Sequence, residues 1–124
     1  MSYSEKKELY SHLADWGLEK VLLSGLNLLE EKKQIPGLDA FINDIREMKE
    51  QYLEELHDFA ERKCQELGKD NKHYKEVDAK LIAIRVEMVR REMEARVEQK
   101  GEGNSSMPGQ QSSTNEVTEE DLIQ

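Results

Sequence analysis

Apolar residues recur every three or four positions along most of the first hundred residues, and this spacing limits the fold more than any other feature. A helical turn takes about 3.6 residues, so the spacing gathers apolar side chains on one face of a helix. Val, Ile, Thr and aromatic residues never alternate with polar ones over the length of a strand. Only 7 Gly and 2 Pro occur in 124 residues, so few positions interrupt a helix. The sequence therefore predicts an all-α chain.

Turn-forming residues divide this pattern into three expected helices, at about 4–33, 39–67 and 71–99. Pro36 and Gly37 would end the first helix, because proline has no N–H to donate and disfavours helix in the residue before it. Gly68 stands where a left-handed residue would end the second helix. Ser2 and Glu5 have the spacing of a capping box at the start of the first helix.

The apolar residues indicate how these helices pack. The stretch from Trp16 to Leu29 is apolar on several sides. The second helix carries one stripe: Phe41, Ile42, Ile45, Met48, Tyr52, Leu56, Phe59, Ala60 and Leu67. The third carries two stripes, the first made of Tyr74, Val77, Leu81, Ile84 and Met88, and the second of Ile82, Val86, Val89, Met93 and Val97. A helix with two stripes contacts more than one neighbour. We expect the second and third helices to form a long antiparallel, coiled-coil-like hairpin with the first packed across it. We also expect self-association into a homo-oligomer, which would cover the apolar stripe that the three helices leave exposed.

The composition changes at Gly101. Residues 101–124 are rich in Gly, Ser, Gln and Asn and contain no Lys or Arg, so they are expected to be a disordered acidic tail after a helical domain at 1–100. Near its end, at 115–124, Val117, Leu122 and Ile123 stand among four acidic residues. This segment is either a short docking motif for a partner or a solubilising tail.

Charge and composition exclude some classes of function. The formal net charge of -9 repels nucleic acid as a whole. The apolar fraction of 36% implies a thin core that a partner could complete. The chain shows no secretory signal, no apolar run long enough to cross a membrane and one cysteine. We expect a cytoplasmic protein without membrane contact.

Some residues have the types that bind metal ions or act in catalysis, but neither kind of site is expected. Glu54 and His57 have the spacing of a carboxylate–histidine ligand pair, but a hairpin that turns at Gly68 would place His57 opposite about position 80. The same register brings Cys64 near His73, with Glu61 and Glu76 close by, which we interpret as a charged hairpin end. No glycine-rich loop or nucleophile elbow is present. The sequence predicts no metal, no cofactor and no enzyme.

The favoured interpretation is an accessory protein (an adaptor, assembly factor or inhibitor) that works by binding another protein. The candidate contact residues are Trp16, Leu22, Leu26, Met88, Met93, Leu122 and Ile123. The alternative is a factor of DNA metabolism that binds nucleic acid through the basic residues of the third helix, Arg85, Arg90, Arg91 and Arg96. A related alternative is an acidic mimic of DNA that blocks a DNA-binding protein.

Overall fold

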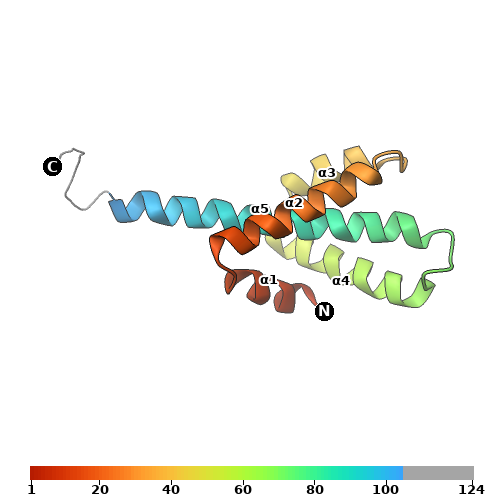
Figure 1. The fold of residues 1–124 in the computed structure, drawn as a ribbon. Coiled ribbons are helices and arrows are strands. Elements are labelled where there is room, and N and C mark those ends of the chain that lie inside the picture. The colour runs from red at the N-terminus through yellow and green to blue at the C-terminus, as the bar shows by residue number, and fades with distance from the viewer. Residues whose placement is uncertain (105–124) are drawn as a thin grey trace. The chain divides into compact units, whose positions relative to one another are not determined.

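The computed structural model describes the backbone of residues 1–104 and the side chains of residues 1–99. The described chain is all-helical, in five helices: α1 (Tyr3–Ser11), α2 (Asp15–Glu31), α3 (Leu38–Arg46), α4 (Glu50–Leu67) and α5 (Tyr74–Asn104) (Figure 1). The all-α class is therefore confirmed. The predicted docking motif at 115–124 lies outside the described residues, as does all of the predicted tail beyond residue 104.

The chain divides into two compact units, residues 1–91 and residues 92–124. The first unit holds α1 to α4 and the first part of α5, and every pocket and buried network described below lies within it. The described part of the second unit is the rest of α5, residues 92–104, in which Arg96 Nε donates to Glu92 Oε2 over 3.1 Å.

Two of the three helix boundaries marked in the sequence, at Ser2 and Gly68, are found in the structure. The Ser2 hydroxyl accepts from the backbone N–H of Glu5, and the Glu5 carboxylate accepts from the N–H of Ser2, which completes the expected capping box. Gly37 (φ 80°) and Gly68 (φ 75°) adopt positive φ at the start of α3 and the end of α4, a conformation that L side chains rarely tolerate. The stop expected at Gly68 is therefore confirmed, whereas the first expected helix ends earlier, at Glu31, and Gly37 directly precedes α3.

The prediction of three helices was wrong at two places. The first expected helix is interrupted at residues 12–14, and the second at residues 47–49. The first break lets α1 pack on α4, where the Tyr3 N–H donates to Asp58 Oδ1 over 2.8 Å, while α2 turns Leu18 and Leu29 to the core. At the second break, the Arg91 guanidinium donates to the carbonyl oxygens of Ile45 and Met48, over 3.1 and 2.6 Å. Arg91 thereby adds a second donor to Ile45 O, which also accepts from the Met48 N–H over 3.2 Å, and supplies a donor to Met48 O just after α3.

The third expected helix also begins later, at Tyr74 rather than at residue 71. The side chain of Asn71 accepts from the N–H of His73 over 2.8 Å, so these residues form a turn instead of the first turn of the helix. The loop between α4 and α5 therefore covers residues 68–73, whereas the predicted helices left only residues 68–70 between them.

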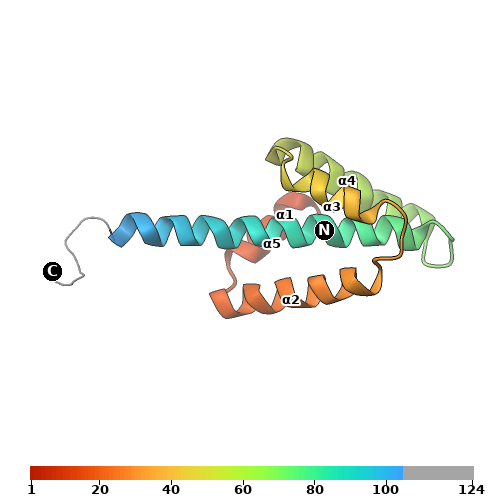
Figure 2. The same ribbon diagram turned by 90° about the horizontal axis from the view of Figure 1, so that it is seen from above.

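The first part of α5 lies at the centre of the first unit. Figure 2 shows α2 on one side of it, and α3 with α4 on the other. The largest side chains with no more than 1% exposure come from α2, α3, α4 and α5. They are Leu18, Leu38, Ile45, Leu53, His57, Ile84 and Val89. Ile84 and Val89 belong to different predicted stripes of the third helix, and both are buried within this chain.

Candidate functional site

The outer side of α2 exposes large apolar side chains. Trp16 is 68% exposed, Leu23 58% and Leu26 44%. Leu18 and Leu29 already occupy the inward side of the same helix, so the apolar residues that follow one another around its circumference cannot all reach the core. We call Trp16, Leu23 and Leu26 the α2 surface. Contiguous exposed apolar side chains of this kind mark interaction sites on soluble domains.

The predicted contact residues have different positions in the structure. Leu22 is half-buried beside the exposed Leu26. Met88 is 5% exposed and packs in the core, so it offers no surface to a partner in this structure. Met93 is partly exposed and belongs to the second unit. Leu122 and Ile123 lie outside the described residues.

Sequence reasoning missed other exposed apolar residues. Leu23 belongs to the α2 surface but was not among the predicted contact residues. It lies in the stretch from Trp16 to Leu29 that is apolar on several sides, and this pattern could have identified it. Tyr52 and Phe59 were expected in the stripe of the second helix, but they are 52% and 51% exposed on α4. The face of α4 that turns inward carries Leu53, His57 and Ala60, of which Ala60 alone was in the predicted stripe.

Two pockets flank α2, each of about 340 Å³. The first, the α2–α5 pocket, is lined by Tyr10, Lys20, Val21, Ser24, Gly25, Leu28, Ile82, Arg85 and Val86. The second is lined by Leu22, Leu26, Leu29, Glu30, Lys33, Asp39, Ile42, Ile45, Arg46, Ala83, Val86, Glu87 and Arg90. A Cβ atom built on Gly25 would lie 2.5 Å from Val86 Cγ2, so the two helices meet closely at this point. Val86 lines both pockets, which places them on either side of this contact.

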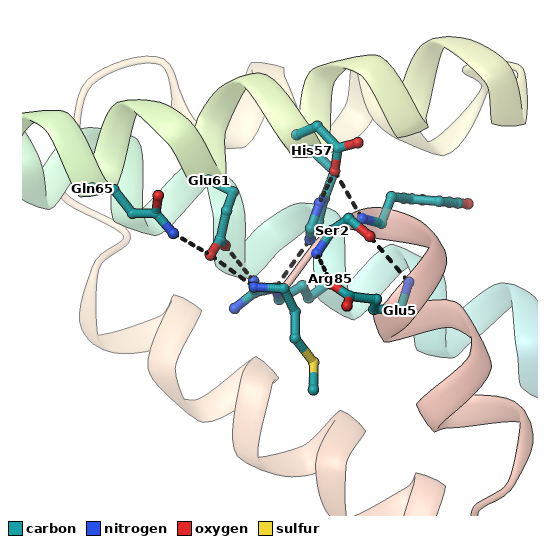
Figure 3. A network of polar contacts seen from close by, with 9 residues as sticks. Ser2, Glu5, His57, Glu61, Gln65 and Arg85 are labelled. Atoms are coloured by element: carbon teal, nitrogen blue, oxygen red, sulfur yellow. Dashed lines mark hydrogen bonds and ion pairs between the residues drawn. The ribbon is translucent and has the colours of Figure 1, made fainter.

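A polar network joins α1, α4 and α5 in the interior (Figure 3). Arg85 Nε donates to His57 Nε2 over 3.2 Å, and His57 Nδ1 lies 3.1 Å from Asp58 Oδ1. Arg85 also forms an ion pair with Glu61 (2.6 Å), which the Met1 amino group contacts at 3.1 Å. His57 has no exposed surface, and burial lowers its pKa below the ordinary value. These contacts tie the N-terminus of the chain, α4 and α5 together.

The arginines proposed for nucleic acid all have carboxylate partners. Arg85 pairs with Glu61, Arg90 and Arg91 both pair with Glu87, and Arg96 pairs with Glu92. Glu87 is only 3% exposed. Burial raises its pKa, but hydrogen bonds from Arg90 and Arg91 outweigh this effect, so the net shift is downward. A phosphate group would have to displace these internal carboxylates.

Other candidate chemistry in the described residues is limited. Within residues 1–99, no group of three or more His, Cys, Asp and Glu side chains is arranged to hold a metal ion. Burial is the largest of the causes that raise the pKa of Cys64, which disfavours the reactive thiolate form. No helix in the described part of the chain is long and apolar enough to cross a membrane.

Comparisons with protein-family models, with curated proteins and with solved structures find no match to this chain.

Proposed function

We propose that this chain is a non-enzymatic accessory protein that binds another protein through the α2 surface. The observation that carries the proposal is the 68% exposure of Trp16, the single tryptophan of the chain, beside Leu23 and Leu26 on one helix. Tryptophan is among the residues that contribute most to protein–protein binding, because it offers a large rigid area at a small cost in entropy.

The energetic reason is the apolar area that α2 leaves in water. Fully burying a side chain such as leucine contributes about 1.5–3 kcal/mol relative to leaving it exposed. Leu23 and Leu26 are roughly half exposed and Trp16 more so, so a partner that covers all three recovers a substantial part of this free energy. Part of it offsets the entropy that association removes.

The role that fits this surface is that of an adaptor, assembly factor or inhibitor in the cytoplasm. In this proposal, α4 and the first part of α5 act as an antiparallel, coiled-coil-like support that holds α2 in place. The acidic residues 115–124, with Leu122 and Ile123, supply a second and weaker contact that raises the overall affinity. A second copy of the chain is the competing occupant of the α2 surface.

The experiment that tests the proposal is affinity capture from a lysate of the source cells with four tagged chains. These are the full chain, the double variant Trp16→Ser/Leu23→Ser, the control variant Val97→Ser, and a chain that ends at Lys100. Val97 is a matched control because it is 69% exposed but lies in the second unit. We expect one protein to be retained by the full chain and by Val97→Ser and to be lost by the double variant. If the double variant retains the same protein, binding does not depend on the α2 surface and the proposal fails. Loss by the truncated chain would assign a contact to the segment after Lys100.

Nucleic-acid binding through α5 has less support. The four arginines are engaged with carboxylates of the same chain, and the net charge of -9 opposes the approach of a phosphate backbone.

A further inference from the structure

The α2–α5 pocket differs from its neighbour in the charges around it. The charged residues that line it are Lys20 and Arg85, and no acidic residue lines it. The second pocket is lined by three acidic and three basic residues. The chain as a whole has a net charge of -9, whereas the charged residues that line this pocket are both basic. The pocket is therefore complementary in charge to an anion.

The residues of α2 that line this pocket run from a charged side chain at Lys20 to apolar side chains farther along the helix. On α2, the lining begins at Lys20 and continues through Val21 to Leu28. Seven residues of helix separate Val21 from Leu28, which corresponds to about 10 Å along the helix axis. The opposite wall comes from Ile82 and Val86 on α5. Gly25 has no side chain to fill the pocket, and a Cβ atom built on it would lie 2.5 Å from Val86 Cγ2.

The two cations differ in their availability. Arg85 is held by Glu61 and His57, so the Glu61 carboxylate largely offsets its charge. Lys20 is exposed, and its Nζ lies 5.7 Å from the centroid of the Trp16 ring. In the described part of the chain, the ammonium of Lys20 has no carboxylate partner. A carboxylate could therefore approach Lys20 without displacing an internal ion pair.

We propose that the α2–α5 pocket binds a fatty acid of medium chain length, with the carboxylate at Lys20 and the acyl chain along Val21, Leu28 and Val86. The volume of about 340 Å³ lies within the range of small-molecule sites, roughly 300–1,000 Å³. An unbranched acyl chain can follow the apolar side chains of α2 between Val21 and Leu28, and its single negative charge matches the ammonium of Lys20. This inference goes beyond the proposed function and does not depend on it.

The test is a titration of the full chain with sodium decanoate at pH 7.5, below the concentration at which decanoate forms micelles. Binding is followed by the fluorescence of Trp16, which is the only tryptophan and lies next to Lys20, and by backbone amide shifts in nuclear magnetic resonance spectra. We expect saturable binding of one decanoate, with the shifts concentrated at Val21–Leu28 and at 82–86. Decyltrimethylammonium, which has the same chain length and the opposite charge, should bind at least about tenfold more weakly.

Two matched variants locate the carboxylate. Lys20→Glu should weaken decanoate binding at least about fivefold, because it places a like charge at the mouth of the pocket. Lys33→Glu makes the same change in charge at an exposed residue of the second pocket and should leave the affinity within about twofold. Both positions are exposed, and circular dichroism checks that both variants fold. The proposal is overturned if decanoate does not saturate the protein, if the shifts map to the second pocket, or if the two variants weaken binding equally.

Discussion

Arg85 on α5 donates its Nε hydrogen to His57 Nε2 on α4, at 3.2 Å, and this contact fixes the protonation state of the histidine. A guanidinium can only donate, so Nε2 must accept and the ring proton must reside on Nδ1. Nδ1 lies 3.1 Å from Asp58 Oδ1, which also accepts from the N–H of Tyr3. A neutral His57 is therefore part of the packing of α1, α4 and α5, and a protonated one would bring a second cation against Arg85.

Acidification should destabilise the protein through His57. Burial holds the pKa of the folded His57 below its ordinary value of about 6.5. The unfolded chain therefore binds this proton at a higher pH than the folded chain does. Stability from this group is present above about pH 6.5 and is lost as the pH falls toward the folded pKa, by at most about 1.4 kcal/mol per pH unit. We expect the free energy of unfolding, measured with urea, to be lower at pH 5 than at pH 7.5.

The variant His57→Gln isolates this effect. Glutamine offers an oxygen to Arg85 but does not titrate, so the loss of stability between pH 7.5 and pH 5 should be smaller in this variant. His73→Gln is the control, because His73 is exposed, and it should keep the wild-type dependence. An equal dependence in all three proteins would show that His57 is not the titrating group.

Gly25 should tolerate no side chain. The Cβ of alanine at this position would lie 2.5 Å from Val86 Cγ2, so the Val86 side chain or one of the two helices must shift. Overpacking of this kind costs about 1–3 kcal/mol. At Gly17, on the same helix, the nearest atom to a new Cβ is 3.8 Å away. Gly17→Ala should therefore stabilise the protein by roughly 0.5–1 kcal/mol, through helix propensity alone.

Urea unfolding of both alanine variants measures this difference. The double variant Gly25→Ala/Val86→Ala should recover part of the loss, because it removes the methyl group that collides with the new Cβ. If Gly25→Ala is as stable as Gly17→Ala, the close approach of α2 to α5 is not present in solution.

Replacing Arg91 should lower the free energy of unfolding by more than the loss of one ion pair would. It donates to Ile45 O and Met48 O at the end of α3 and is itself held by Glu87 at 2.7 Å. Arg91→Met would leave two carbonyls and a buried carboxylate with fewer partners, a cost of about 1–3 kcal/mol. Arg96→Met, which removes an i, i+4 pair with Glu92, should cost about 0.5 kcal/mol or less. Thermal unfolding of the two variants compares them, and equal losses would contradict the bridging role of Arg91.

The chain should not bind DNA. Its four candidate arginines are paired internally and its net charge is -9. We expect no retention on DNA-cellulose even at low ionic strength, where attraction to phosphate is strongest. Retention that weakens steeply with added salt and is lost in Arg90→Gln would instead support the nucleic-acid alternative.

Local signals in the sequence predicted the helical class and several helix ends, because these depend on residues close in the chain. Ser2 with Glu5 is one example and Gly68 is another. The break between α3 and α4 could not be predicted in this way, since the group that donates to its carbonyls, Arg91, is more than forty residues away. The position predicted to lie opposite His57 was wrong for a related reason. The Asn71 turn lengthens the loop before α5, so His57 meets Arg85 instead of a residue near position 80.

The α2 surface was partly predictable. A helix that is apolar on several sides must leave some of those side chains outside, and Trp16 and Leu26 were among the candidates. Which residues face outward depends on how α2 turns after the break at residues 12–14, and this is set by the packing of Leu18 and Leu29. Met88, predicted as a contact residue, is buried in the structure because the first part of α5 is covered from several sides by the same chain.

The most direct test of the central claim is photo-crosslinking with a benzophenone amino acid placed at position 16 and, as a matched control, at position 97. The two native side chains, Trp16 and Val97, have nearly equal exposure, 68% and 69%, so accessibility alone cannot distinguish the two positions. The account predicts that the probe at position 16, in lysate of the source cells, crosslinks one protein in good yield, and that Leu23→Ser in the same chain abolishes the product. Position 97 should give no such product. Equal crosslinking at both positions, or a product at position 16 that persists with Leu23→Ser, would contradict binding through the α2 surface.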